Sequence, residues 1–538
     1  MATSQRSGDT APGLEPASPA DAKTVSRGRA GVAGALAAAA ALGVGELAAG
    51  LIRGATSLVI EIGDQVIDLA PGGVERTAIE VVGSLDKPLL LTGIVGISLL
   101  LGSVFGQLAA RRFLLGAAGF VAFAVVGAVA AFQDPRASRL GSVLVALIAA
   151  AVGVGVLRLL LRAGSPLSPQ RRAQSSSRRI GPDGVDRRGF LRVAMGTAVA
   201  ASVSAVGGKL LAGRDRVSAI RASTKIPRPL RRAAPPPPAG AELAIAGLSP
   251  LFVPNASFYR IDTALAVPQV DTTNWSLEVK GKVARPLKLN YQDLLDMPHI
   301  EADVTLSCVS NEVGGDLVGN ARWQGVALRE LLDRAGVQPG GTQIVGRSVD
   351  DFTAGFPTAI GMDTPNAMVA VAMNGEPLPA RHGFPARLVI PGLYGYVSAT
   401  KWLASIELVD FDEFNGYWIP RGWSKLGPVK TQSRIDTPRR TAKAGRTPIA
   451  GVAWAPTRGI SKVEVNIDGG PWQLARLAEE LHADTWRQWV YDWDATPGPH
   501  SISVRATDGK GVTQTEQKTE VAPDGASGHH TVGIEVSA

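Results

Sequence analysis

A single cysteine, Cys308, is the residue best able to do chemistry in this chain of 538 residues. Its thiolate would be a soft ligand for a transition metal. One cysteine excludes an intramolecular disulfide, a four-cysteine zinc site, an iron–sulfur cluster and a covalently attached c-type haem. All six histidines follow Pro254, so the apolar segments hold no histidine pair for a b-type haem, and we expect neither haem nor iron–sulfur cluster. A buried structural thiol and a thiol redox group without a resolving cysteine are the other interpretations.

The sequence around Cys308 has the pattern of a strand, a glycine-rich loop and a helix. It reads DVTLSCVSNEVGGDLVGNARWQGVALRELL over residues 303–332, with Cys308 at the end of the strand-like run and Asn311 three residues later. This segment resembles the sulfite oxidase family of molybdopterin-dependent oxidoreductases, in a membrane-anchored, actinobacterial-type form. The resemblance implies an α+β domain, a molybdenum–molybdopterin cofactor, Cys308 as the metal ligand and catalytic centre, and Asn311 as a cofactor contact.

Three further segments resemble the family in the same order. Residues 258–260 match a segment that lies over the molybdenum and pterin, which makes Tyr259 and Arg260 cofactor-binding candidates. Arg260 is also a catalytic candidate that would steer or stabilise an anionic oxygen. Residues 381–392 and 398–403 resemble the paired pterin-binding segments, whose cofactor-binding candidates are His382, Arg387, Ser398, Ala399, Thr400 and Lys401. By the resemblance, the histidine, arginine and lysine hold the pterin phosphate and ring, and residues 398–400 add backbone contacts.

Two positions depart from the family pattern. Glu312 and Val313 stand where sulfite oxidases carry another arginine, and Phe352 stands where a tyrosine near the metal is common. The loss of positive charge leaves sulfite oxidation and the reduction of an S- or N-oxide equally open. We therefore expect oxygen-atom transfer, coupled to two-electron redox, on a small sulfur- or nitrogen-containing substrate. The alternative is a membrane-tethered binding protein of the cell envelope with a catalytically empty fold of this family.

Apolar segments before this domain predict a helical transmembrane region. A helix needs about 20 apolar residues to cross the hydrocarbon layer. Residues 30–162 contain four such stretches, at 30–52, 88–110, 113–132 and 140–161, and a fifth follows at 189–212. Arginine and lysine gather in residues 1–29, at 111–112 and in the loop 163–188, which places these on the cytoplasmic side. We expect a multi-pass cell-membrane protein with a disordered cytoplasmic N-terminal tail and an extracytoplasmic catalytic part.

The segment Asp186-Arg187-Arg188-Gly189-Phe190-Leu191 resembles a twin-arginine export signal in the middle of the chain. Two more cytoplasmic arginines are the simpler interpretation. The neighbouring phenylalanine and leucine and the small-residue apolar stretch favour the signal. Because that route exports folded proteins, the resemblance implies a cofactor in the domain that follows.

The exported part divides into a linker and two domains. Residues 213–240 form a proline-rich linker, and residues 241–430 mix strand and helix patterns, which indicates the α+β molybdopterin-binding domain. Residues 440–538 alternate apolar and polar positions between turn sequences, which predicts an immunoglobulin-like β-sandwich of the kind used for dimer contact in the family. In this C-terminal domain, the only stretch with a pattern that could form a helix is 474–481.

The net charge of +8 does not indicate a nucleic-acid partner, because much of the arginine lies beside apolar segments. The expected partners are a small-molecule substrate, membrane lipid and a separate electron carrier, either a protein or a quinone. A homodimer is an expectation from the family alone.

Overall fold

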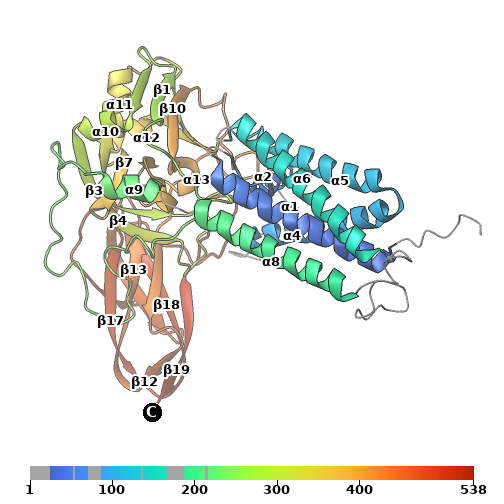
Figure 1. The fold of residues 1–538 in the computed structure, drawn as a ribbon. Helices are drawn as coiled ribbons and strands as arrows, with labels where there is room; N and C mark the ends of the chain where they lie inside the picture. Colours follow the sequence, from blue (N-terminus) through green and yellow to red (C-terminus); the bar gives the residue numbers. More distant parts are fainter. Residues whose placement is uncertain (1–24, 53–54, 71–85, 135–136, 166–186, 213–215) are drawn as a thin grey trace, which may run out of the picture. The chain divides into compact units, whose positions relative to one another are not determined.

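The computed structural model describes residues 25–52, 55–70, 86–134, 137–165, 187–212 and 216–538 (Figure 1). The chain divides into two compact units, which we describe separately. The first comprises residues 1–62, 88–132 and 137–212, and the second comprises residues 63–87, 133–136 and 213–538. Most of the predicted cytoplasmic tail, most of the loop 163–188 and the first residue of the twin-arginine segment, Asp186, lie outside the described residues.

Five helices are long and apolar enough to cross a membrane, and they coincide with the five predicted stretches. The helix α1 packs against α6 and α8, and its buried residues are small, among them Ala30, Ala33 and Ala37. Small residues let helix backbones approach closely, as is common between membrane helices. A shorter helix, α2 (Leu58–Leu69), lies between α1 and α4 in the sequence. The five long helices are α1 (Arg27–Leu51), α4 (Asp86–Arg111), α5 (Phe113–Ala131), α6 (Arg139–Gly164) and α8 (Arg187–Ala212).

Two sheets with short helices make up the α+β part of the second unit. The first has the order β2-β1-β10-β5-β6, and the second has the order β3-β4-β7-β8 with β9 also paired to β7. The strands of the first sheet are β1 (Ser276–Gly281), β2 (Leu287–Asn290), β5 (Gln343–Ser348), β6 (Thr353–Pro357) and β10 (Leu403–Val409). Those of the second are β3 (His299–Ser307), β4 (Val318–Ala327), β7 (Met368–Met373), β8 (Glu376–Pro377) and β9 (Arg387–Val389). The helices are α9 (Arg216–Ser223), α10 (Tyr291–Asp296), α11 (Leu328–Ala335), α12 (Thr358–Asp363), the 3₁₀ turn η2 (Ala380–His382) and α13 (Gly395–Ser398).

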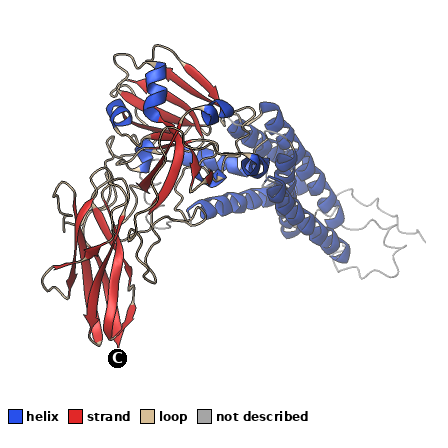
Figure 2. Cartoon of the chain, turned by 90° about the vertical axis from the view of Figure 1, so that its left-hand side faces the viewer, coloured by secondary structure: helices blue, strands red, loops and turns tan. Residues whose placement is uncertain are grey.

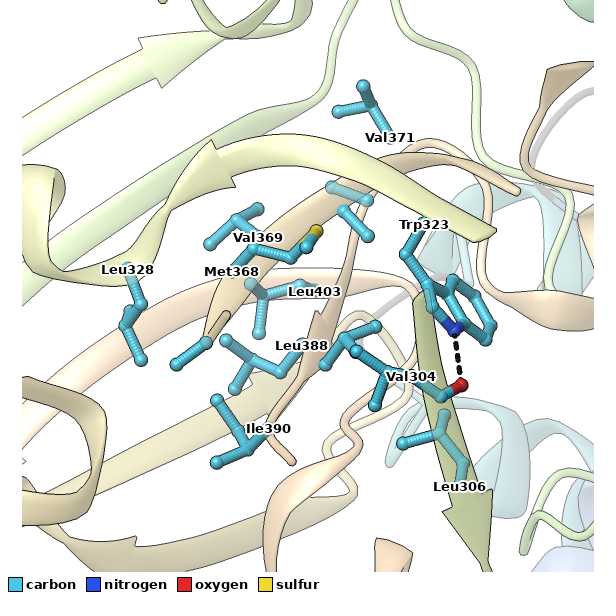
Figure 3. Close-up of a cluster of buried hydrophobic side chains, with 14 of the residues drawn as sticks. Val304, Leu306, Trp323, Leu328, Met368, Val369, Val371, Leu388, Ile390 and Leu403 are labelled. Carbon is cyan, nitrogen blue, oxygen red and sulfur yellow. Dashed lines mark hydrogen bonds between the residues drawn. The ribbon is translucent and has the colours of Figure 1, made fainter. Parts of the chain in front are cut away.

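A continuous apolar core includes Val304 and Leu306 of β3, the strand that leads to Cys308 (Figure 3). Every residue of β7 is buried, as expected for a central strand covered on both faces. Trp323 on β4 is fully buried, and its indole N–H donates to the carbonyl oxygen of Val304 on β3 over 3.2 Å. The indole thereby fills the core without leaving a buried donor unpaired.

The predicted linker is attached to the α+β part. Arg232 forms a parallel bridge with Ile300, beside the outer edge of β3. The Arg231 N–H donates to the carbonyl of His299 over 3.0 Å, and the Glu301 N–H donates to the carbonyl of Arg232 over 2.8 Å. The linker thus covers part of the strand edge that would otherwise be open to other chains.

The C-terminal residues form two packed sheets that share one apolar core (Figure 2). One sheet has the order β11-β13-β17-β16 and the other the order β12-β19-β18-β14-β15. The predicted strands are present, the stretch 474–481 holds short strands in place of a helix, and the immunoglobulin type stays a prediction. The strands are β11 (Gln432–Thr437), β12 (Thr441–Lys443), β13 (Gly445–Trp454), β14 (Ile460–Ile467), β15 (Gln473–Leu474), β16 (Arg476–Leu477), β17 (Arg487–Ala495), β18 (Gly498–Asp508) and β19 (His530–Ser537).

Candidate active site

Cys308 follows β3 directly and begins the loop that leads into β4. Its backbone N–H donates to the carbonyl oxygen of Leu317 over 2.9 Å, and 7% of its surface is exposed. Burial raises the pKa of the thiol, while hydrogen bonding to Ser310 and the charge of Lys401 oppose that rise. The protein therefore holds the sulfur in a fixed, largely dry position, where metal coordination would deprotonate it.

Asn311 lies in the same loop and is 2% exposed. Its Oδ1 accepts a hydrogen bond from the backbone N–H of Leu317 over 2.8 Å. Its Nδ2 is buried and has no hydrogen-bond partner in the described part of the chain. Since an unpaired buried amide group costs free energy, this nitrogen is available to a bound acceptor next to the cysteine loop.

The segment that carries Tyr259 and Arg260 reaches the site through aromatic packing. The Phe258 ring stacks on Tyr259 at 5.2 Å and meets the rings of Trp323 and His382 edge to face at 5.8 and 5.7 Å. Burial raises the pKa of Tyr259 well above its usual range, and the nearby charge of Cys308 adds to the rise. The hydroxyl therefore stays protonated near the sulfur and can donate a hydrogen bond.

An acid that the sequence analysis missed, Asp262, joins two of the predicted cations. Arg260 donates to both of its carboxylate oxygens, from Nε over 2.7 Å and from Nη2 over 3.1 Å. The Lys401 ammonium donates to the same carboxylate over 2.6 Å and to the carbonyl of Ile261 over 2.9 Å. Burial alone would raise the pKa of Asp262, but Lys401 and Arg260 lower it well below its usual range. The only sequence signal was an acid two residues after Arg260.

A tight turn brings Arg387 and Lys401 together. Gly383, which follows η2, has φ of 108°, a left-handed conformation that side chains rarely adopt. A Cβ atom placed on Gly383 would lie 3.0 Å from the Cβ of Lys401 and 3.2 Å from that of Arg387. The turn therefore has room only for glycine between the two predicted phosphate-binding cations.

Arg387 is a buried cation on β9, with 5% of its surface exposed. Its guanidinium lies 5.0 Å from the Trp323 ring centroid and donates to the carbonyls of His382 and Leu388, each over 3.3 Å. Burial lowers its pKa to about 10, and no carboxylate among the described residues pairs with it. A buried charge normally requires a partner of opposite charge, so this site suits an anionic ligand.

His382 is buried, and its Nε2 lies 2.9 Å from the carbonyl oxygen of Asn255. Burial lowers the pKa of His382 to about 4, so the ring is neutral at pH 7. As a neutral group, His382 adds no positive charge to a phosphate site. Its contacts join the turn at Gly383 to the segment that carries Tyr259.

The predicted residues 398–400 begin at the last residue of α13 and continue to a position beside β9. The Ser398 hydroxyl donates to the carbonyl of Tyr394 over 3.0 Å, and the Thr400 hydroxyl donates to that of Gly346 over 3.3 Å. The Ala399 N–H donates within the helix end, and the Thr400 carbonyl accepts from the Leu388 N–H over 2.9 Å. This last bond places Lys401 next to the strand of Arg387. Of the residues that depart from the family pattern, Glu312 is exposed in the loop that begins at Cys308, and the Phe352 ring contacts Tyr417 at 5.7 Å.

Comparison with known proteins identifies this arrangement. Residues 264–418 match the family described as the oxidoreductase molybdopterin binding domain. The uncharacterized oxidoreductase YuiH of Bacillus subtilis is 32% identical over 157 residues, which are 29% of this chain and 76% of that protein. This chain belongs to the sulfite oxidase family of molybdopterin-dependent oxidoreductases.

Longer relatives match a larger part of the chain. Human mitochondrial sulfite oxidase is 32% identical over 301 residues, 47% of this chain and 54% of the human protein. The chain thus spans about half the length of the sulfite oxidases that it matches. The solved sulfane dehydrogenase SoxCD of Paracoccus pantotrophus is 22% identical, with a TM-score of 0.47 over 54% of this chain and 84% of that one.

The described residues fit the molybdenum cofactor. Cys308 offers a buried sulfur, Asn311 an unused buried donor, and Arg387 a buried positive charge without a carboxylate partner. These are the groups that a soft metal, a polar pterin and an anionic phosphate each require. One domain therefore offers a group for each part of the cofactor.

Proposed function

We propose that this protein is a membrane-anchored, extracytoplasmic oxidoreductase that transfers an oxygen atom to or from a small sulfur- or nitrogen-containing substrate. The observation that carries the proposal is that one domain holds both the buried Cys308 and the buried Arg387. Among the described residues, Arg387 has no carboxylate partner. In a fold that binds no cofactor, a buried charge without a partner of opposite charge would only destabilise the protein.

Each site residue has a proposed role toward the cofactor. Cys308 would hold molybdenum through Sγ, and Arg387 and Lys401 would oppose the negative charge of the pterin phosphate. When bound, the cofactor supplies the exchange of one oxygen atom and two electrons, while the protein supplies position and field. Asn311 would donate from Nδ2, neutral His382 would support the turn at Gly383, and residues 398–400 would line the pterin.

The substrate would lie near Tyr259 and Arg260. The protonated Tyr259 hydroxyl can donate to a substrate oxygen. Arg260 is 30% exposed in its side chain, but its charge is already shared with Asp262. A site of this charge suits an uncharged S- or N-oxide as well as a sulfite-like anion, so both substrate classes belong to the proposal.

The apolar helices would anchor the enzyme in the cell membrane, with the N-terminus cytoplasmic and the catalytic part outside. The five helices of suitable length support the anchor, and the arginine-rich loops support the orientation. Electrons would be exchanged with a separate carrier, either a protein or a quinone, and a homodimer would be the family arrangement.

The decisive experiment measures molybdenum and pterin in the purified full chain, expressed in a host that makes the cofactor, beside a Cys308→Ser variant. We expect about one metal and one pterin per chain and a visible absorption band that changes in the variant. A chain without metal and pterin from that host would instead be the membrane-tethered binding protein.

A second experiment tests export. Replacing Arg187 and Arg188 with lysine should leave the catalytic part on the cytoplasmic face, where external protease cannot reach it in intact cells. The matched control replaces Arg111 and Arg112, which also lie beside an apolar helix, with lysine. Unchanged accessibility of the Arg187/Arg188 variant to protease would contradict the twin-arginine route.

A further inference from the structure

The loop that begins at Cys308 contacts the C-terminal sandwich as well as the site. Arg434, on β11, donates from Nη1 to the carbonyl oxygen of Gly315 over 2.7 Å. The two residues are 119 positions apart in the chain. This bond ties the metal-binding loop to a strand of the other domain.

The guanidinium of Arg434 is held on all of its nitrogens. Nε donates to Asp436 Oδ1 over 2.6 Å, and Nη2 donates to the Ser249 hydroxyl over 2.9 Å. The Ser249 N–H in turn donates to Asp436 Oδ2 over 3.0 Å. The side chains of Arg434 and Asp436 are 8% and 0% exposed. A planar fork with every nitrogen engaged has one orientation, so the Gly315 carbonyl has a fixed anchor.

A second contact lies one residue earlier in the loop. Gly314 has φ of 81°, and a Cβ placed on it would come within 2.2 Å of Cδ2 of His530. The His530 ring is fixed by the Ile435 N–H, which donates to Nδ1 over 2.9 Å. The loop backbone therefore lies directly against the sandwich, with no space for a side chain between them.

Gly315 also contacts the residues that follow Cys308 in the loop. A Cβ on Gly315 would lie 2.8 Å from Asn311 Oδ1, which also accepts from the Leu317 N–H. The Leu317 carbonyl accepts from the Cys308 N–H. A displacement of Gly315 would therefore be passed through Asn311 and Leu317 to the cysteine, within a packed interior that deforms little.

We infer that Arg434 is a positioning residue for the metal-binding cysteine: through its bond to Gly315, the C-terminal sandwich sets the conformation of the loop 308–317. The inference rests on the proposed role of Cys308 as the metal ligand. It gives the sandwich a part in the active site, in addition to packing and dimer contact.

The test uses the only cysteine of the chain as its own reporter. The full chain, purified in detergent from a host that does not make the cofactor, is labelled with a maleimide, and the rate at Cys308 is measured. Arg434→Gln should raise that rate about tenfold, because a charge-assisted hydrogen bond that restrains loop opening is lost. Arg434→Lys, which keeps the charge but cannot make all three contacts, should give a smaller increase and serves if the glutamine variant does not fold.

Arg458 provides the matched control. It is another sandwich arginine paired with a buried acid, Asp508, over 2.8 Å, and it donates to a backbone carbonyl, that of Val429, over 3.0 Å. Arg458→Gln should lower thermal stability to a similar degree but leave the labelling rate within twofold of the unmodified chain. Equal rates in the Arg434 and Arg458 variants would overturn the positioning role.

The loaded protein gives an independent readout. Arg434→Gln should retain pterin, shift the visible band that Cys308→Ser also changes, and lower kcat more than it changes KM. An unshifted band in Arg434→Gln would contradict the inference and leave the proposed function intact. A band that is unchanged in Cys308→Ser would instead remove the proposed function.

Discussion

The charge of Lys401 is the residue-scale feature on which the proposed binding of the pterin phosphate depends. Burial lowers the pKa of Lys401 to about 8, although the carboxylate of Asp262 opposes that shift. In the free site, about half of the Lys401 side chains have therefore lost the proton, and with it the charge, at about pH 8. A phosphate would bind the charged form and raise the pKa of Lys401 again.

This linkage predicts a loss of cofactor affinity at alkaline pH. As the pH rises through about 8, the free site loses the proton that the bound state retains. Affinity should then fall by up to about tenfold per pH unit, because one proton is linked to binding. Pterin retained after equilibrium dialysis between pH 7 and 9.5 measures the effect. Lys401→Arg, whose charge persists, should flatten the profile, and the same decline in that variant would assign the pH dependence to another group.

In the proposed site, Asp262 would set the charge that the substrate meets. Asp262→Asn would remove the carboxylate that Arg260 and Lys401 share and leave the site one unit more positive. Inhibition by sulfate, a non-reacting anion, should then tighten about tenfold, the value of one charge-assisted hydrogen bond. The KM of an uncharged S-oxide should change by less than twofold. Asp262→Glu is the control that retains the charge, and equal sulfate inhibition in all three proteins would show that Arg260 does not face the substrate.

At the scale of the elements, the turn between η2 and β9 is a tightly constrained part of the proposed pterin site. Gly383→Ala would force a side chain into a left-handed conformation and against Lys401. Gly375→Ala is the matched control, because Gly375 has φ of 81° and no atom within 4 Å of the added Cβ. Both variants should lose about 1–2 kcal/mol of stability from backbone strain. Only the Gly383 variant should also lose bound pterin, and equal pterin in both would separate this turn from the cofactor.

Local patterns predicted the elements well where side-chain spacing decides the structure. The helix predicted after the glycine-rich loop is α11, because Leu328, Leu331, Leu332 and Ala335 form one buried stripe. The stretch 474–481 was ambiguous, and pairing with β14 and β17 makes it extended. Tertiary pairing overrides local preference in such short segments.

The site itself was predictable as a set of residues but not as a set of contacts. Cys308, Arg387 and Lys401 follow from residue type, motif order and the family resemblance. The bridge through Asp262 and the anchor from Arg434 do not, because each depends on how segments distant in sequence meet. Asp262 and Lys401 are separated by 139 positions, and no local spacing reports that contact.

At the scale of the whole molecule, the linker is the connection whose role the sequence left most open. Its proline-rich composition is typical of a spacer, yet it donates to and accepts from the backbone of β3, the strand that leads to Cys308. Its Pro227 carbonyl also accepts from Gln324 on β4 over 2.6 Å. Within the same segment, Arg221 on α9 donates to the carbonyl of Leu378 over 2.7 Å.

The linker should therefore stabilise the catalytic domain even after the membrane helices are removed. Two soluble fragments, residues 216–538 and residues 242–538, differ only in residues 216–241, which include α9 and the proline-rich stretch. Loss of several buried hydrogen bonds, each worth about 1 kcal/mol, should lower the Tm of the shorter fragment by roughly 5 °C or more. It should also aggregate more readily, because the edge of β3 is uncovered. Equal Tm values in differential scanning calorimetry would mean that the linker is a spacer in energetic terms, despite its place beside the strand.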